Sequence, residues 1–327
     1  MASNGISFGA SLATLRRHKI GNIIIVFFTI QIVAVLAALI FPDQFRYLDV
    51  LNIQVLLKDI PQVGVIALGV NLLMIAGEFD LSVGATFTFT ALCMAKIFNA
   101  GANVWVAALV GIAIGAAIGW LNGFITVRSR VPSFIITLGS MMFWRGMILV
   151  LSQSVTERFA PGPVFEAIFT SSFGPIQIQF VWLVGLTVLT WFLLERHRIG
   201  NHFFAVGGNR MAASALGINP NRVKIIAFVI TGALAAFSGI LSTVRVASVS
   251  PIQGEGFELQ AIAASVIGGT ALMGGQGSVI GAFLGAALLS TIQDFLLLLR
   301  APGAYLKLFV GVIVVFAAIL NQLLKKD

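Results

Sequence analysis

Two carboxylates, Glu78 and Asp80, lie where the chain leaves one apolar segment and enters the next. Asp80 directly precedes an apolar run that begins at Leu81. Its carboxylate can therefore accept the free backbone N–H groups of a helix that starts there and favour the positive end of that helix. Capping is the interpretation that we prefer for Asp80. Glu78 has no comparable capping position, and an ionisable side chain near membrane depth indicates a functional site. A shallow, solvated position would instead make Glu78 an ordinary surface charge.

A broken helix at this point would line a substrate path, as half-helices do in many transporters. The candidate pathway residues are polar or aromatic side chains in or beside the apolar segments: Asn71, Glu78, Asp80, Ser82 and Phe134. Arg145 interrupts another apolar run, where a charge must pair, reach the interface or face water. The sequence does not identify its partner.

Motifs for catalysis and metal binding are missing from the sequence. It contains no His-Glu-x-x-His, no Cys-x-x-Cys, no Gly-x-Ser-x-Gly and no phosphate-binding Gly-x-x-x-x-Gly-Lys-Ser/Thr. The histidines His18, His197 and His202 do not have the spacing of a metal site. We therefore expect no catalytic residues, no cofactor and no metal, which disfavours a membrane enzyme. Any energy from ATP would have to come from another protein.

The composition is that of a membrane protein. Hydrophobic residues make up 58% of the 327 residues and charged residues 10%, against about 45–50% and about 25% in soluble domains. Apolar runs reach the roughly 17–25 residues that cross a bilayer as a helix. We predict an all-α polytopic membrane protein with one integral domain, residues 1–327, because no polar linker divides the chain. Cys93, the single cysteine, can form no internal disulfide.

About ten membrane segments are expected, some of them short or broken. They lie near residues 20–41, 61–77, 81–98, 104–127, 133–151, 180–194, 224–244, 258–273, 278–298 and 304–324. The second, third and eighth are short and interrupted by glycine or carboxylates, so they are candidates for broken or re-entrant helices. The first run is too long for a signal-peptide core and no small-residue cleavage site follows it, so we expect a span that is retained.

The net charge of +8 is interpreted as a topology signal and not as a sign of nucleic-acid binding. An even number of spans places both termini on one side, and we predict that both lie in the cytoplasm. The cytoplasmic segments then hold an excess of basic residues, namely Arg16, Arg17, Lys19, Arg128, Arg130, Arg196, Arg198, Arg210, Arg222, Lys224, Lys325 and Lys326. The outer loops hold acidic residues, namely Asp43, Asp49, Asp59, Glu157, Glu166, Glu255 and Glu258.

The polar interruption from Glu195 to Lys224 is predicted to be a cytoplasmic loop with one short helix. Asn209 is a good N-cap, Gly217 suits a left-handed stop and Pro220 prevents continuation. A helix of about two turns is marginal alone in water and needs packing. From spacing alone, two interpretations of this helix remain equally open. It is either an ordinary loop helix that lies against the membrane surface or a helix that docks into a groove of a partner protein.

Glycines at intervals of four predict close helix packing, within the protein or between two copies. They form two series, Gly111, Gly115, Gly119 and Gly123 in the fourth segment and Gly277, Gly281 and Gly285 around the ninth. Residues 76–85 and 273–282 also resemble each other in glycine placement, which favours an internal duplication.

Five motifs in order carry a resemblance to a known family: GEFDLSVG at 77–84, VPSFIITLG at 131–139, AVGGN at 205–209, IGGT at 267–270 and GGQGS at 274–278. Together they strongly resemble the permease subunits of bacterial ABC importers of the ribose and monosaccharide class, over residues 61–325. Glu78 departs from the pattern, because many relatives have glycine or a small apolar residue there.

The resemblance implies a multi-pass protein of the bacterial inner membrane and its partners. Two permease copies, as a homodimer, would form the pore for a monosaccharide or related polyol. Two ATP-binding domains, separate or in tandem, would dock below, and a periplasmic binding protein would deliver the substrate to the outer loops. A coupling helix would contact the ATP-binding subunit through residues at Gly207, Gly208, Asn209, Arg210, Ala212, Ala213, Leu216 and Gly217. Import of a furanose-like signal molecule, and a proton-coupled transporter with Glu78 or Asp80 as relay, remain alternatives.

Overall fold

A computed structural model of the chain describes residues 19–302 and, beyond them, residues 305, 308, 309, 311, 312, 315 and 319. Residues 19–302 form mostly helices: α2 (Lys19–Ile40), α3 (Val50–Ile75), α4 (Val83–Asn99), α5 (Val104–Ser129), α6 (Ser133–Ser152), α7 (Pro163–Thr170), α8 (Ile178–Glu195), α9 (Arg198–Gly208), α10 (Arg210–Ala215), α11 (Pro220–Val246), α12 (Phe257–Ile267) and α13 (Val279–Leu298). Arg16, Arg17, Lys325, Lys326 and most of the expected tenth span, 304–324, lie outside the described residues.

Strands in the described part of the chain are two residues long. β1 (Glu157–Arg158) pairs antiparallel with β4 (Ser248–Val249), and β2 (Ser172–Phe173) pairs antiparallel with β3 (Ile176–Gln177). These pairs tie together the loops near α7. With so little sheet, the predicted all-α class is confirmed.

Seven described helices are long and apolar enough to cross a membrane: α2, α3, α5, α6, α8, α11 and α13. The apolar helices α4 and α12 are shorter, at 17 and 11 residues, as expected for the third and eighth segments. The second segment differs from the prediction, because α3 is one continuous helix of 26 residues that begins at Val50 and contains Pro61. A proline inside a helix costs one backbone hydrogen bond, and here burial on neighbouring helices outweighs that cost.

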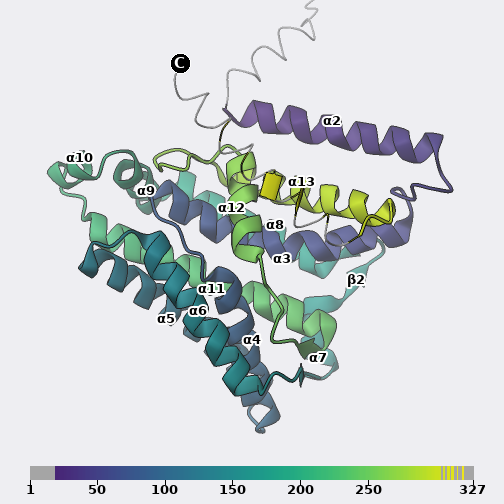
Figure 1. Ribbon diagram of the computed structural model, residues 1–327, viewed down its shortest axis with the longest axis horizontal. Helices are drawn as coiled ribbons and strands as arrows, with labels where there is room; N and C mark the ends of the chain where they lie inside the picture. The colour runs from purple at the N-terminus through teal and green to yellow at the C-terminus, as the bar shows by residue number, and fades with distance from the viewer. Residues whose placement is uncertain are drawn as a thin grey trace, which may run out of the picture.

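The long helix α11 lies at the centre of the bundle, packed against α3, α4 and α5 (Figure 1). Its contact with α5 requires glycine, since a Cβ on Gly115 would lie 2.5 Å from the carbonyl oxygen of Gly232. A Cβ on Gly281 of α13 would likewise lie 2.0 Å from the carbonyl oxygen of Gly268. Both predicted glycine series therefore include helix-packing positions, where dispersion contacts replace the hydrophobic effect that lipid does not supply.

Figure 1 shows α9 and α10 on the left of the molecule, and α7 and β2 on the lower right. We refer to these two parts as the α10 end and the α7 end. The helix α2 runs along the top of the same view and packs against α13.

Candidate functional site

The short helix α10 has the termini that its sequence predicts. The side-chain oxygen of Asn209 accepts a hydrogen bond from the backbone N–H of Ala212 at 3.0 Å. At the other end, Gly217 has a left-handed φ of 81° and the N–H of Ile218 donates to the carbonyl of Ala213 at 3.0 Å. Local cap chemistry thus determines where α10 begins and ends.

A second helix in the same loop, α9, is absent from the prediction. The ring nitrogen of His197 caps its start by accepting from the N–H of Ile199 at 3.2 Å. Its buried side chains, among them Phe203 and Val206, face α3, α8 and α11. The apolar spacing of Ile199, Phe203 and Val206 is the helical signal that could have identified it.

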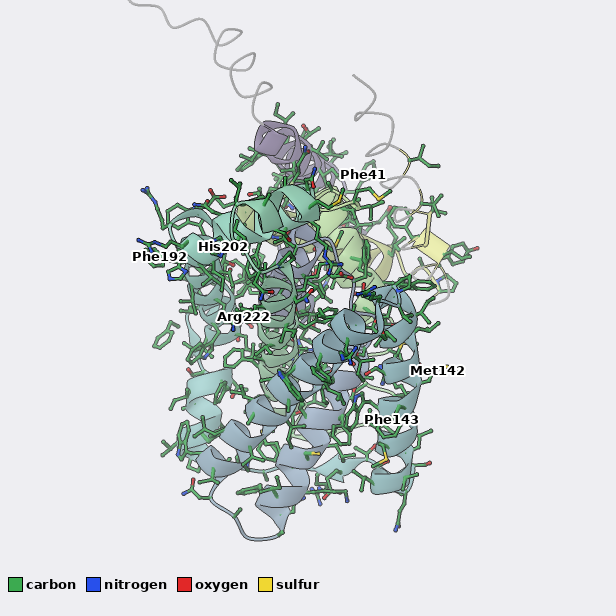
Figure 2. The ribbon with its side chains drawn as sticks, turned by 90° about the vertical axis from the view of Figure 1, so that its left-hand side faces the viewer. Phe41, Met142, Phe143, Phe192, His202 and Arg222 are labelled. Atoms are coloured by element: carbon green, nitrogen blue, oxygen red, sulfur yellow. The ribbon has the colours of Figure 1, made fainter. Side chains whose placement is uncertain are left out.

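The outer surface of α10 combines exposed apolar and basic side chains. Met211 is 83% exposed and Leu216 is 79% exposed, whereas Ala213 is only 2% exposed. Arg210 of α10 is exposed as well, and further exposed arginines lie in the flanking elements, at Arg196 after α8, Arg198 in α9 and Arg222 in α11. Figure 2 looks onto this side of the molecule, with Arg222 and His202 labelled. Ala213 therefore anchors α10 to the protein, while Met211 and Leu216 are available to a partner.

The C-terminal turn of α9 packs directly on backbone from two distant segments. A Cβ on Gly207 would lie 1.8 Å from the carbonyl oxygen of Ile75 at the end of α3. The N–H of Gly275 donates to the same carbonyl at 2.9 Å, and a Cβ on Gly274 would lie 2.8 Å from the Cα of Gly77. We call Gly77, Gly207, Gly274 and Gly275 the glycine junction. The two segments with similar glycine placement, 76–85 and 273–282, meet there.

Glu78 lies beside the glycine junction and forms an ion pair with Lys224 in the first turns of α11. Their side chains are only 11% and 13% exposed, respectively. This contact fastens the turn after α3 to the helix that follows α10. Among the residues that the structure describes, Glu78 is therefore a paired carboxylate and not a free one.

Asp80 stabilises the start of α4 from within the preceding turn. Its Oδ1 accepts from the backbone N–H of Ser82 at 2.8 Å and from the Ser82 hydroxyl at 2.6 Å, and Asn122 of α5 donates to that hydroxyl at 2.8 Å. The carboxylate thus caps the turn, although it bonds to Ser82 and not to the first turn of α4.

The five candidate pathway residues do not share one open surface. Asn71, Asp80 and Ser82 are fully buried, Glu78 is nearly so, and Phe134 is exposed at the start of α6. Asn71 accepts a hydrogen bond from Thr270, which joins α3 to the segment after α12. In this arrangement the four polar residues hold helices together.

Arg145 has a partner that the sequence could not identify. Its guanidinium donates at 2.9 Å to the backbone carbonyl of Gln253, in the segment between β4 and α12. The side chain of Gln253 donates in turn to Ser242 at 2.7 Å.

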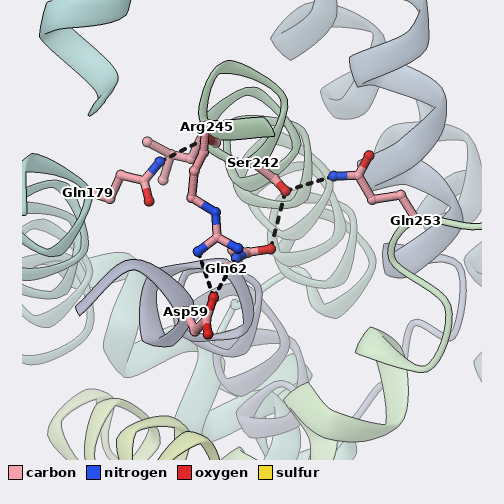
Figure 3. Close-up of polar contacts among 7 residues, drawn as sticks. Asp59, Gln62, Gln179, Ser242, Arg245 and Gln253 are labelled. Carbon is pink, nitrogen blue, oxygen red and sulfur yellow. Dashed lines mark hydrogen bonds and ion pairs between the residues drawn. The ribbon is translucent and has the colours of Figure 1, made fainter. Parts of the chain in front are cut away.

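Figure 3 shows that the hydrogen bond between Gln253 and Ser242 of α11 is one of a series of polar contacts that extends to Gln62 and Asp59 of α3. The Gln62 amide lies 3.2 Å from the Ser242 hydroxyl, and with its oxygen turned toward Arg245 it accepts from both guanidinium nitrogens at 2.8 and 3.1 Å. Arg245 also forms an ion pair with Asp59 at 2.6 Å. These side chains bind α3, α11 and the segment before α12 into one polar network.

Comparison with known proteins gives a family model and relatives that are all described as transport permeases. Residues 51–318 match the family model described as branched-chain amino acid transport system, permease component. The chain is 35% identical to the ribose import permease protein RbsC of Escherichia coli (strain K12) over 79% of this chain and 81% of the relative. It is 30% identical to the D-allose transport system permease protein AlsC of the same strain, over 92% and 91%. It is 31% identical to the autoinducer 2 import system permease protein LsrC of Salmonella choleraesuis (strain SC-B67), over 86% and 82%. No solved structure matches the chain.

The fold and these matches define a multi-pass membrane permease. The chain belongs to the family of permease subunits of bacterial ABC importers of the ribose and monosaccharide class, which confirms the resemblance, and its place is the bacterial inner membrane. Members of this family are transport subunits and not enzymes.

Proposed function

We propose that this chain is the membrane subunit of an ATP-driven importer and that α10 is its coupling helix. The observation that carries the proposal is the exposed surface of α10, where Met211 and Leu216 project beside the exposed Arg210, in a loop that holds further exposed arginines. Exposed apolar anchors with a charged surround are typical of protein–protein contacts. An ATP-binding subunit, as two domains or a tandem protein, is the partner. Two copies of this chain form the pathway.

The proposed orientation places the α10 end and both termini in the cytoplasm. Basic residues gather at the α10 end, at Arg196, Arg198, Arg210, Arg222 and Lys224. Acidic residues occur at the α7 end, at Glu157 in β1 and Glu166 in α7. This separation follows the positive-inside rule. A periplasmic binding protein would then dock at the α7 end.

Force on α10 would reach the bundle interior by two routes. Through α9, it acts on the carbonyl of Ile75 at the glycine junction. Through α11, it acts on Glu78 by way of the Lys224 ion pair. Both routes lead to the turn that precedes α4, so closure of the ATP-binding domains would reorient α4 as a rigid element.

The substrate is a monosaccharide or related polyol, by analogy with the relatives named for ribose and D-allose. The relative named for autoinducer 2 import supports a furanose-like signal molecule as the second candidate. A ligand screen on the cognate binding protein separates them. Pairing of Glu78 with Lys224 and of Asp80 with Ser82 disfavours a proton relay at these carboxylates.

Uptake in proteoliposomes tests the proposal. The chain is reconstituted with its ATP-binding subunit, and the sugar-loaded binding protein is added outside. Accumulation that requires ATP supports the proposal. Accumulation that needs no ATP-binding subunit and follows an imposed pH gradient contradicts it.

A further inference from the structure

The segment that connects β4 to α12, residues 250–256, is neither helix nor strand. We call it the unwound segment. It begins beside β4, which pairs with β1, and Glu157 of β1 binds Lys96 near the end of α4. By Gly254 it has reached Gly84 in the first turn of α4, where a Cβ on Gly84 would lie 2.4 Å from the Gly254 carbonyl oxygen. The part of α4 between Gly84 and Lys96 is about 18 Å long at 1.5 Å per residue, so the unwound segment descends deep into the membrane region. Glu255 and Glu258 then lie deeper than the outer loop that was predicted for them.

Polar contacts from three helices hold the unwound segment in place. The carbonyl of Gln253 accepts from Arg145 of α6 and from the Thr88 hydroxyl of α4. The side chain of Gln253 donates to Ser242 of α11 (Figure 3). Gly256, with a φ of 82°, then starts α12. The unwound segment is thus a built feature of the fold.

Charged side chains lie beside the unwound segment. A Cβ on Gly84 would meet Oε2 of Glu258 at 2.4 Å and a guanidinium nitrogen of Arg145 at 3.4 Å, so both groups approach the start of α4. Glu255 lies two residues after Gln253, whose carbonyl binds Arg145. Glu258 accepts from the N–H of Gly256 through Oε1 at 3.2 Å, while its Oε2 is buried and has no hydrogen-bond partner among the described residues. Glu255, Ile252 and Leu259 are exposed.

Lipid is an unsuitable neighbour for this surface. Backbone outside a helix is tolerated at membrane depth only inside protein or along a water-filled cavity. An exposed carboxylate such as Glu255 also needs protein or water around it, because transfer of an ion into hydrocarbon costs free energy. The surface of the unwound segment with Glu255, Glu258 and Arg145 must therefore face water or polar groups when the protein is in the membrane.

We propose that this surface is a wall of the translocation pathway and that it contacts the hydroxyl groups of a neutral, hydroxyl-rich substrate. The exposed carboxylate of Glu255 and Oε1 of the half-buried Glu258 accept from substrate hydroxyls, and Arg145 donates to them. Charged groups form stronger hydrogen bonds than neutral ones, and a small number of them suffices for a substrate that must also leave. This inference rests on the proposed function, and it moves the pathway away from the buried Asn71, Asp80 and Ser82.

Labelling of introduced cysteines tests the water exposure of the surface without knowledge of the substrate. In a Cys93→Ser background, Glu255→Cys and Ile252→Cys are treated in membranes with a charged, membrane-impermeant thiol reagent. We expect both to be labelled at least about tenfold faster than Leu189→Cys, an exposed apolar position in the middle of α8. Labelling as slow as that of Leu189→Cys overturns the proposal, and so does efficient disulfide formation between copies without labelling, because the surface would then be a dry contact between two copies.

Uptake kinetics test the contact with hydroxyl groups. The probe is the sugar that the cognate binding protein retains in a ligand screen. For Glu258→Gln we expect a roughly ten- to hundredfold lower uptake rate, the usual effect of losing a hydrogen bond to a charged group, with normal yield and assembly. Asp43→Asn, in the turn after α2, is the matched carboxylate control and should transport normally. Normal uptake by Glu258→Gln and Glu255→Gln overturns the proposal. If wild-type uptake needs no ATP, the proposed function fails, but the labelling result still stands.

Discussion

Lys224 and Glu78 form an ion pair across two segments that are distant in sequence, with both side chains mostly removed from solvent. One residue belongs to the helix that follows α10, and the other belongs to the turn that leads into α4. The pair therefore links the proposed docking element to a helix of the bundle interior.

Removing one member of this pair should destabilise the protein more than reversing both. Glu78→Gln leaves a largely buried ammonium without its partner, which costs about 3–5 kcal/mol in comparable pairs. The exchange of Glu78→Lys with Lys224→Glu should recover most of that loss. Thermal unfolding in detergent is measured for Glu78→Lys, for Lys224→Glu and for the double exchange, which together form a double-mutant cycle. Additive effects of the two single changes would show that the pair does not couple the segments.

Changes on the outer surface of α10 should prevent docking without unfolding the permease. Met211→Glu and Leu216→Glu place charges on exposed positions, so stability should change by about 0.5 kcal/mol or less. Co-purification with the ATP-binding subunit should be lost. Phe173→Glu, an exposed apolar position at the α7 end, is the control and should leave docking intact. Ala213→Arg is unsuitable for this purpose, because Ala213 is buried and the arginine would displace α10 itself.

A methyl group at the glycine junction should be more harmful than one on an open helix face. In Gly207→Ala, the new Cβ would meet the carbonyl oxygen of Ile75 at 1.8 Å, so backbone must move. Gly139→Ala on α6 meets no atom within 4 Å, and it should stabilise its helix by about 0.5–1 kcal/mol. Yield, thermal stability and ATP-driven uptake are compared for the two variants. Equal behaviour would contradict a tight contact between α9 and α3.

The pair Lys96–Glu157 predicts a small dependence of stability on pH. Hydrogen bonds from Lys96 and Asn99 lower the pKa of Glu157 below its ordinary value. The folded state then binds the proton less tightly than the unfolded state, so the stabilisation is present above the ordinary carboxyl pKa and is lost as the pH falls through the lower, folded value. Because the pair is partly exposed, Lys96→Met should cost about 0.5 kcal/mol or less at pH 7. That difference should begin to shrink as the pH falls below the ordinary carboxyl value of about 4.3 and vanish once the pH passes the lower, folded value. A difference that grows in acid would contradict the assignment.

Local signals made much of the fold predictable. Asn209, Gly217 and Pro220 define the ends of α10 through contacts within a few residues, and glycines four apart identify the packing face of α5 on α11. Seven of the ten expected segments overlap a described helix that is long and apolar enough to cross a membrane, as apolar length predicts. The predicted second segment began at residue 61, whereas α3 begins at Val50 and continues through the buried Pro61.

Contacts between distant segments were not predictable. Arg145 binds a backbone carbonyl, and a carbonyl has no signature in the sequence. Glu78 was recognisable as unusual, but Lys224 as its partner depends on how α11 crosses the turn after α3. The pathway role of Asn71, Asp80 and Ser82 was predicted from their polarity and stays a prediction, while their burial, which the structure shows, has no signature in the sequence.

Photo-crosslinking from position 211 tests the central claim most directly. A photoreactive amino acid replaces Met211, and the importer is assembled with its ATP-binding subunit and binding protein before illumination. If α10 is the coupling helix, the main crosslinked product joins this chain to the ATP-binding subunit. A crosslink only to lipid or to a second permease copy, in an assembly that still transports, would contradict the account.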